Sequence, residues 1–228
     1  MYRQFLIFDA DDTLWENNIY FEEAFEQFCR YLAHSSMSPA QIRTVLDEIE
    51  AINAKVNGYG SRNFGHNLAC CFQRLAERDI SDTDLAAVRE FAHAILERPV
   101  ELLTGVAETV SELSSRHNLT IFTKGDPEEQ LRKIDRSGLT EYFQQYAIVK
   151  EKNEPAYREL ARQRRFPSGA TWMIGNSPKS DINPALAAGL NAVYVPHPRT
   201  WSLENEHVPD EHPRLLRVSA IAELTSYF

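Results

Sequence analysis

The sequence predicts an α/β protein with a parallel sheet, interrupted near its start by an inserted cap of four helices. After residue 99, short apolar runs alternate with amphipathic segments, which is typical of strands joined by helices that cover both faces of a sheet. Another short apolar run, at residues 5–8, precedes a long stretch of helical periodicity. We therefore expect residues 1–15 and 99–228 to form a three-layer core and residues 16–98 to form the cap.

Residues 5–8 are too few to show helical periodicity and predict a buried first strand. In the cap, apolar residues at spacings of three and four predict helices at about residues 21–32, 39–52, 68–75 and 81–95. Ser38 and Pro39 are the N-cap and first position of the second helix, and Pro99 ends the last one. The turn residues of segment 57–66 separate the second helix from the third.

The core elements after the cap follow in alternating order. They are a helix at 106–116, a strand at 119–123, a helix from 127 to 138, a strand at 146–149, a helix at 155–163, a strand at 172–174, a helix at 181–188 and a strand at 192–195. The first strand is expected to join these strands in one sheet.

Composition narrows the classes of function. The 228 residues carry a formal net charge of −9 and contain 43% hydrophobic residues, which suits a packed protein and argues against nucleic acid as the partner. The three cysteines are an odd number and include an adjacent pair, so a reducing compartment is expected. With no apolar stretch of membrane-spanning length, we expect a cytoplasmic protein.

Carboxylates are crowded directly after the first predicted strand. Asp9, Asp11 and Asp12 lie within four residues, where they repel one another and are costly to bury unless a positive charge sits among them. Oxygen ligands of this kind suit a hard divalent cation. An acidic N-cap formed by Asp12 and Thr13 is the alternative, but a cap needs one side chain and three carboxylates are present. This cluster predicts an enzyme.

Polar residues also follow the other predicted strands. Because ligands of parallel sheets collect beyond the carboxyl ends of strands, these positions are candidate site residues. Each residue alone has a simpler interpretation: Thr123 as a turn residue, the lysines as surface residues and Asp181 as an N-cap. Their occurrence together, always at strand ends, favours a site. The candidates are Thr123 and Lys124, then Lys150 and Lys152, then Asn176 and Asp181.

These residues resemble the motifs of the haloacid dehalogenase superfamily of phosphohydrolases, over the whole chain. "FDADDTL" is similar to the first motif, Thr123 at the end of "LTIFT" to the second, "KEKNEPAY" to the lysine motif and "WMIGNSPKSDINPALAAG" to the fourth. The helical segment matches the cap that this superfamily inserts after the first motif. The resemblance implies a Rossmann-like core. Lys150 and Lys152 compete for the lysine motif, and the spacing of Lys152 to Pro155 is closer to that of the family.

The resemblance implies phosphoryl transfer through an aspartyl-phosphate. Asp9 would be the nucleophile, and Asp11 would protonate the leaving group and then activate water. Thr123 would donate a hydrogen bond to the phosphoryl group, Lys152 would neutralise charge on nucleophile and phosphate, and the segment at Lys124 would help to hold the phosphate.

The resemblance also implies Mg²⁺ as the cofactor. Its ligands would be Asp9, the backbone carbonyl of Asp11, and the fourth motif through Asn176 and Asp181. The fourth motif usually begins with glycine-aspartate, but here Asn176 follows Gly175. An amide oxygen carries no charge, so we expect weaker metal binding, which Asp181 would compensate directly or through a water.

The function implied is a magnesium-dependent phosphatase acting on a small phosphorylated metabolite. The dehalogenase branch lacks an aspartate at the position of Asp11, because it has no alcohol leaving group to protonate. A phosphomutase and a catalytically weak phosphate-binding protein on the same scaffold stay open. A phospho-receiver signalling module shares strand-end aspartates but is far shorter and has no helical insertion.

Within the cap, the segment "NGYGSRNFGH" carries a further hypothesis. Tyr59 and Arg62 lie among turn residues, and an arginine suits an anionic substrate. We expect both to contact the leaving group of the substrate. The alternative is a surface turn with a solvated arginine. The segment "PHPRTWSLENEH" near the carboxyl end is expected to be a surface loop without chemistry.

Overall fold

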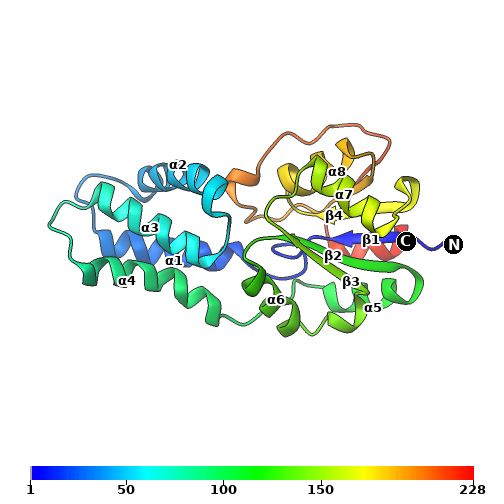
Figure 1. Ribbon diagram of the computed structural model, residues 1–228, viewed down its shortest axis with the longest axis horizontal. Coiled ribbons are helices and arrows are strands. Elements are labelled where there is room, and N and C mark those ends of the chain that lie inside the picture. The colour runs from blue at the N-terminus through cyan, green and yellow to red at the C-terminus, as the bar shows by residue number, and fades with distance from the viewer. Residues whose placement is uncertain (1) are drawn as a thin grey trace. The chain divides into compact units, whose positions relative to one another are not determined.

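The structure is a computed structural model that describes residues 2–228, so Met1 of the predicted core lies outside the described residues. The chain forms two compact units, shown in Figure 1. The segment that ends at Glu16 belongs with Val100–Phe228, and Asn17–Pro99 is the second unit. The fold class is confirmed as an α/β core with an inserted helical cap. Within the described residues, no helix has both the length and the apolar character needed to cross a lipid bilayer.

The core unit contains a parallel sheet with strand order β3-β2-β1-β4-β5-β6. The strands are β1 (Phe5–Phe8), β2 (Asn118–Lys124), β3 (Gln145–Val149), β4 (Thr171–Gly175), β5 (Asn191–Tyr194) and β6 (Leu215–Arg217). Phe8 pairs with Ile121 of β2 and Ile174 of β4, so β1 and β4 end side by side, and β2 continues past them to Lys124. The edge strand β6 was not predicted, because three residues after a proline show no periodicity.

Helices cover both faces of this sheet, as Figure 1 shows. One face carries α5 (Val106–Arg116), α6 (Pro127–Arg136) and α9 (Leu224–Tyr227), and the other carries α7 (Glu154–Arg164) and α8 (Asn183–Ala187). Because side chains of a strand alternate between faces, Leu6 and Phe8 pack in the first layer and Ile7 in the second. All three are fully buried, which fixes β1 at the centre of the core.

The cap unit is a bundle of four helices followed by a short 3₁₀ turn. They are α1 (Asn18–Leu32), α2 (Pro39–Asn57), α3 (Ser61–Leu75), α4 (Asp82–His93) and η1 (Ala94–Glu97). Buried aromatic residues such as Phe28 and Phe72 form its core. Ser38 forms the predicted capping box with Gln41, since each side chain bonds the other's backbone N–H.

One expectation in the cap was wrong. Residues 61–66 are the first turns of α3 and not part of the turn before it, which is confined to residues 58–60. Gly65 is a packing residue, because a Cβ there would lie 3.2 Å from Ala92 Cβ and 3.3 Å from Arg89 O of α4. The glycine lets the two helices approach closely. In the sequence alone, a glycine at this position indicates a turn.

The chain after β4 turns in an unusual way. A π-helical turn, η4 (Pro178–Ile182), precedes α8 and buries Asp181 completely. The extra residue of a π-turn widens the helix and is often used to aim a side chain. Asp181 packs directly over Gly175, so that a Cβ at residue 175 would lie 2.3 Å from Asp181 Oδ2. The end of β4 therefore requires glycine for space.

We predict that Gly175→Ala destabilises the protein by about 2 kcal/mol through overpacking, because neither the strand nor the buried carboxylate can shift freely. Urea unfolding followed by circular dichroism measures the change. Gly169→Ala is the matched control, since a Cβ at residue 169 would meet no heavy atom of the described residues within 4 Å, its chain neighbours aside. Equal stability of the two variants would contradict the packing argument.

Candidate active site

The residue that follows the central strand carries a fully engaged carboxylate. The Asp9 backbone N–H donates to Ile174 O at 2.9 Å, which extends the sheet by one residue. Its Oδ2 accepts from Thr13 Oγ1 at 2.9 Å, and its Oδ1 accepts from Lys152 Nζ at 2.6 Å. Asp12 has a φ of 59°, a left-handed conformation that reverses the chain and brings Thr13 back to Asp9.

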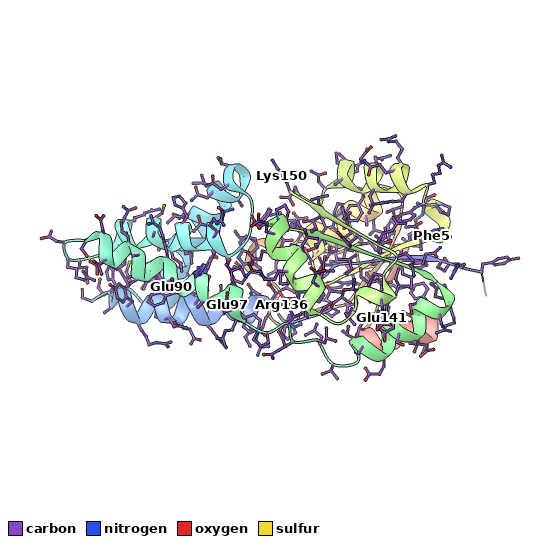
Figure 2. The ribbon with its side chains drawn as sticks, turned by 60° about the horizontal axis from the view of Figure 1, so that its bottom comes forward. Phe5, Glu90, Glu97, Arg136, Glu141 and Lys150 are labelled. Atoms are coloured by element: carbon purple, nitrogen blue, oxygen red, sulfur yellow. The ribbon has the colours of Figure 1, made fainter. Side chains whose placement is uncertain are left out.

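Lys152 holds two carboxylates together. Its ammonium forms ion pairs with Asp9 and Asp181 and also donates to Phe122 O at 3.1 Å. Burial disfavours the ammonium, but the carboxylates of Asp181 and Asp9 raise the pKa of Lys152 above its ordinary value. Lys150, labelled in Figure 2, is exposed, so Lys152 is the lysine of this site.

Asp181 and Asn176 complete the group. Burial, followed by the charge of Asp9, raises the pKa of Asp181 to about 7, and Lys152 only partly opposes this. Asp181 Oδ2 accepts from Ser177 N at 2.9 Å. Asn176 is buried, and its Oδ1 lies 3.3 Å from Thr13 Oγ1, the hydroxyl that donates to Asp9.

These residues fit a divalent cation. Two buried carboxylates, Asp9 and Asp181, share one ammonium, so one negative charge is left uncompensated when both are ionised. Asp181 Oδ1 is buried and forms an ion pair with Lys152. Among residues 2–228 it has no hydrogen-bond partner with suitable geometry. Asp9, Asp181 and Asn176 are oxygen donors of the kind that Mg²⁺ prefers.

The second aspartate of the first motif lies in a different set of contacts. Both oxygens of Asp11 contact Lys133 Nζ at 2.7 Å, Oδ2 also accepts from Gln130 Nε2 at 2.9 Å, and Oδ1 from Trp15 Nε1 at 2.8 Å. Gln130 Oε1 accepts from Thr123 Oγ1 at 3.3 Å. Helix α6 therefore links the ends of β1 and β2 through side chains.

Lys124 has a buried acidic partner. Its Nζ donates to Glu204 Oε1 at 2.6 Å and to Ser180 Oγ at 2.8 Å, while Ser177 Oγ donates to Glu204 Oε2 at 2.6 Å. Burial alone would raise the pKa of Glu204, but the Lys124 charge and these hydrogen bonds hold it below its ordinary value. The Lys124 ammonium is thus neutralised within the protein.

Residues 6–195 match the sequence model of a family described as haloacid dehalogenase-like hydrolase. The chain belongs to this family. It is 30% identical to a haloacid dehalogenase-like family hydrolase from Xanthomonas campestris, with a TM-score of 0.83 over 99% of this chain and 94% of that one. A search of curated proteins gave no match.

Two further solved structures show the same fold at lower identity. The putative HAD-hydrolase YfnB from Bacillus subtilis, whose structure holds magnesium, is 18% identical, with a TM-score of 0.71 over 100% of this chain and 99% of that one. A predicted phosphoglycolate phosphatase from Haemophilus somnus is 14% identical, with a TM-score of 0.67 over 99% and 97%. Dehalogenases and a putative phosphoglucomutase also match, so the fold alone does not select one reaction.

In this haloacid dehalogenase-like hydrolase, residues 196–207 form a loop with mostly exposed side chains, as expected, but not all of the loop lies at the surface. Glu204 is buried against Lys124, and Thr200 Oγ1 accepts from Asn176 Nδ2 at 3.0 Å. Nothing in the polar sequence around Glu204 signals its burial. Gln130 had a detectable signal, since it lies four residues before the buried Ile134 on the same face of α6.

The same segment brings His197 to Asp12 and Glu16 at 3.9 and 3.7 Å. Each of Asp12, Glu16 and His197 offers one ligand atom, and these atoms lie within 4.8 Å of one another. Within residues 2–228 this is the one such group of acidic, histidine or cysteine side chains. Arg199 lies 3.8 Å from Glu16 and supplies positive charge to the group. Burial lowers the pKa of His197.

Tyr59 and Arg62, the two candidates for substrate contact, both belong to the cap unit. Tyr59 lies in the turn between α2 and α3, half-buried, and its carbonyl accepts from Asn63 Nδ2 at 3.4 Å. Arg62 is exposed and belongs to the first turn of α3, not to the turn before it. Both stay candidates for substrate contact.

We predict that Glu204→Gln lowers the free energy of unfolding by about 2 kcal/mol at neutral pH, because the half-enclosed Lys124 ammonium loses its charged partner. Glu151, 3.5 Å from the same ammonium, limits the loss. Since the pKa of Glu204 is lowered on folding, its contribution is present above pH 4.5 and is lost as the pH falls below that value.

Urea unfolding at pH 7 and at pH 3 measures this difference, with the exposed Glu211→Gln as the control. A gap between the two variants that stays constant across this pH range would count against a buried Glu204 carboxylate.

Proposed function

We propose that the chain is a magnesium-dependent phosphatase that hydrolyses a small phosphorylated metabolite through an aspartyl-phosphate. The observation that carries this proposal is the contact between Asp9 Oδ1 and Lys152 Nζ at 2.6 Å, buried at the carboxyl end of the central strand. A carboxylate held there by an ammonium is an oriented nucleophile, and the same ammonium can neutralise an incoming phosphate. The proposal places the phosphoryl group beside Asp9.

In the first step, a carboxylate oxygen of Asp9 attacks phosphorus as the bond to the leaving oxygen breaks. Thr13 and Lys152 restrain the Asp9 carboxylate from both sides, so little rotational freedom is lost on reaching the attacking geometry. Thr123, at the end of β2, is proposed to donate to a phosphoryl oxygen after releasing Gln130. Mg²⁺, held by Asp9, Asn176 and Asp181, would supply charge stabilisation when bound.

Asp11 is proposed to act as acid and then as base. In the structure its side chain is paired with Lys133. Without a proton, the Asp11 carboxylate can take one from water in the second step. Protonating the leaving oxygen in the first step requires Asp11 to carry a proton and to leave Lys133. Water then attacks phosphorus, its proton goes to Asp11, the bond to Asp9 breaks, and inorganic phosphate is released.

Lys124 enters the proposal in a revised role. The resemblance implies phosphate binding by this segment, but the ammonium is already paired with Glu204. We propose that it contributes by fixing the loop that bears Glu204, and that the backbone N–H groups after β2 face the phosphate. Free Cys29, Cys70 and Cys71 accord with the proposed cytoplasmic location.

We predict that Asp9→Asn lowers kcat for p-nitrophenyl phosphate at least about a thousandfold, because an amide is a poor nucleophile. Asp11→Asn is expected to cost about a hundredfold or more. EDTA should abolish turnover and Mg²⁺ should restore it. Exposed Asp135→Asn on α6 is the matched control and should stay within about twofold of wild type.

Full activity of Asp9→Asn would exclude the proposed nucleophile. Wild-type protein that binds phosphate esters without turning over any of a metabolite panel would identify a binding protein. Transfer of phosphate between two positions of one sugar, without release, would identify a phosphomutase.

For the cap, we predict that Arg62→Ala raises KM for the preferred metabolite by about tenfold, the value of one charge-assisted hydrogen bond, and leaves p-nitrophenyl phosphate unaffected. The preferred metabolite is first found with a panel of phosphate esters. Arg30→Ala, an exposed arginine on α1, is the control. An unchanged ranking of substrates in Arg62→Ala would remove Arg62 from the substrate site.

A further inference from the structure

Asn176 has an orientation problem that an aspartate would not have. It follows β4 directly and is buried, with one end of its amide toward Thr13, the residue that donates to Asp9, and the other end toward Thr200. An amide is nearly symmetric in shape, but only its oxygen can ligate a cation, while its NH₂ can only donate. Whichever group the neighbours select decides whether Asn176 can serve the proposed metal site.

The neighbour on the Asp9 side, Thr13, does not hold the Asn176 amide in its observed orientation. Asn176 Oδ1 lies 3.3 Å from Thr13 Oγ1, and that hydroxyl donates its proton to Asp9 Oδ2 at 2.9 Å. With its single proton given to Asp9, Thr13 Oγ1 presents lone pairs to Asn176, so on this side an amide NH₂ would fit better than the observed oxygen. On this side, a flipped Asn176 would be satisfied.

The neighbour on the other side, Thr200, favours the observed orientation of the amide. Thr200 Oγ1 donates to His197 O at 3.0 Å, and the Thr200 backbone N–H reaches the same carbonyl at 3.2 Å. With its single proton committed to this turn, Thr200 Oγ1 can only accept, and Asn176 Nδ2 donates to it at 3.0 Å. A flipped Asn176 would place two acceptor oxygens against each other.

The turn that carries Thr200 is itself held in place. Glu204, four residues on, is buried between Lys124 and Ser177, the residue that follows Asn176. The hydroxyl of Thr200 is therefore presented to Asn176 by a segment that is fixed against the ends of β2 and β4.

We propose that Thr200 is a positioning residue that holds the Asn176 amide oxygen toward Asp9, and so gives this chain a working cation ligand where its family usually has an aspartate. The proposal rests on the proposed magnesium site. A carboxylate offers an oxygen whichever way it is turned, so Thr200 matters only because residue 176 is an amide.

The test measures Mg²⁺ binding directly. Purified full-length wild type, Thr200→Val and Thr200→Ser are titrated with Mg²⁺ by isothermal calorimetry, with metal-free melting temperatures to confirm folding. Thr200→Val, which keeps the shape and removes the hydroxyl, should raise the Kd for Mg²⁺ by about tenfold or more. Thr200→Ser, which keeps the hydroxyl, should stay within about threefold. Thr200→Ala removes the same hydroxyl if Thr200→Val does not fold.

The decisive comparison repeats the change in an Asn176→Asp background. There, adding Thr200→Val should alter the Kd by less than about threefold, because the carboxylate needs no orienting. An equal loss in both backgrounds would overturn the inference, since Thr200 would then act through the loop as a whole. An unchanged Kd for Mg²⁺ in Thr200→Val would also overturn the inference, but it would leave the phosphatase proposal intact. Absence of Mg²⁺ binding in wild type would overturn both proposals.

Discussion

The ammonium of Lys152 between Asp9 and Asp181 is the interaction on which the rest of the core depends. All three charges are buried, and burial of an ion pair is favourable only when the geometry is good and the remaining polar atoms are satisfied. One positive charge does not balance two negative ones, and the raised pKa of Asp181 expresses this imbalance. The surrounding backbone is arranged to tolerate it: Ser177 donates an N–H to Asp181, and Gly175 leaves room for the carboxylate.

The same constraint accounts for the position of β1 at the centre of the sheet. Asp9, Lys152 and Asp181 follow β1, β3 and β4, and the parallel order β3-β2-β1-β4 brings the carboxyl ends of these strands to one edge of the sheet. The π-helical turn that carries Asp181 is a local departure from regular helix that serves this meeting point. The irregular segments of the core thus lie where charge has to be placed, and the regular ones lie where apolar surface is buried.

This division also explains what the sequence could predict. Strand ends are visible as apolar runs that stop at a polar residue, so Asp9, Thr123 and Asn176 were identifiable without a structure. The partners of those residues come from elsewhere. Lys133 is an ordinary helix lysine by its pattern, and Glu204 lies in a polar stretch, so neither shows a signal of the contacts it makes. Their roles depend on long-range geometry, which propensity and periodicity do not encode. The start of α3 was missed for a related reason, because Gly65 serves helix packing and not a turn.

At the position of Asn176 the resemblance to the family implies an aspartate, and the same balance of charge bears on this difference. A carboxylate at that position would add a further negative charge beside Asp9 and Asp181, with Lys152 as the shared counter-ion. The amide lowers repulsion in the metal-free protein but also lowers attraction for a cation, since its oxygen carries only a partial charge. A site with fewer charges relies more on the exact direction of each remaining oxygen. In the proposed magnesium site, orientation of a neutral ligand by its hydrogen-bond partners would then do part of what charge does in a carboxylate site.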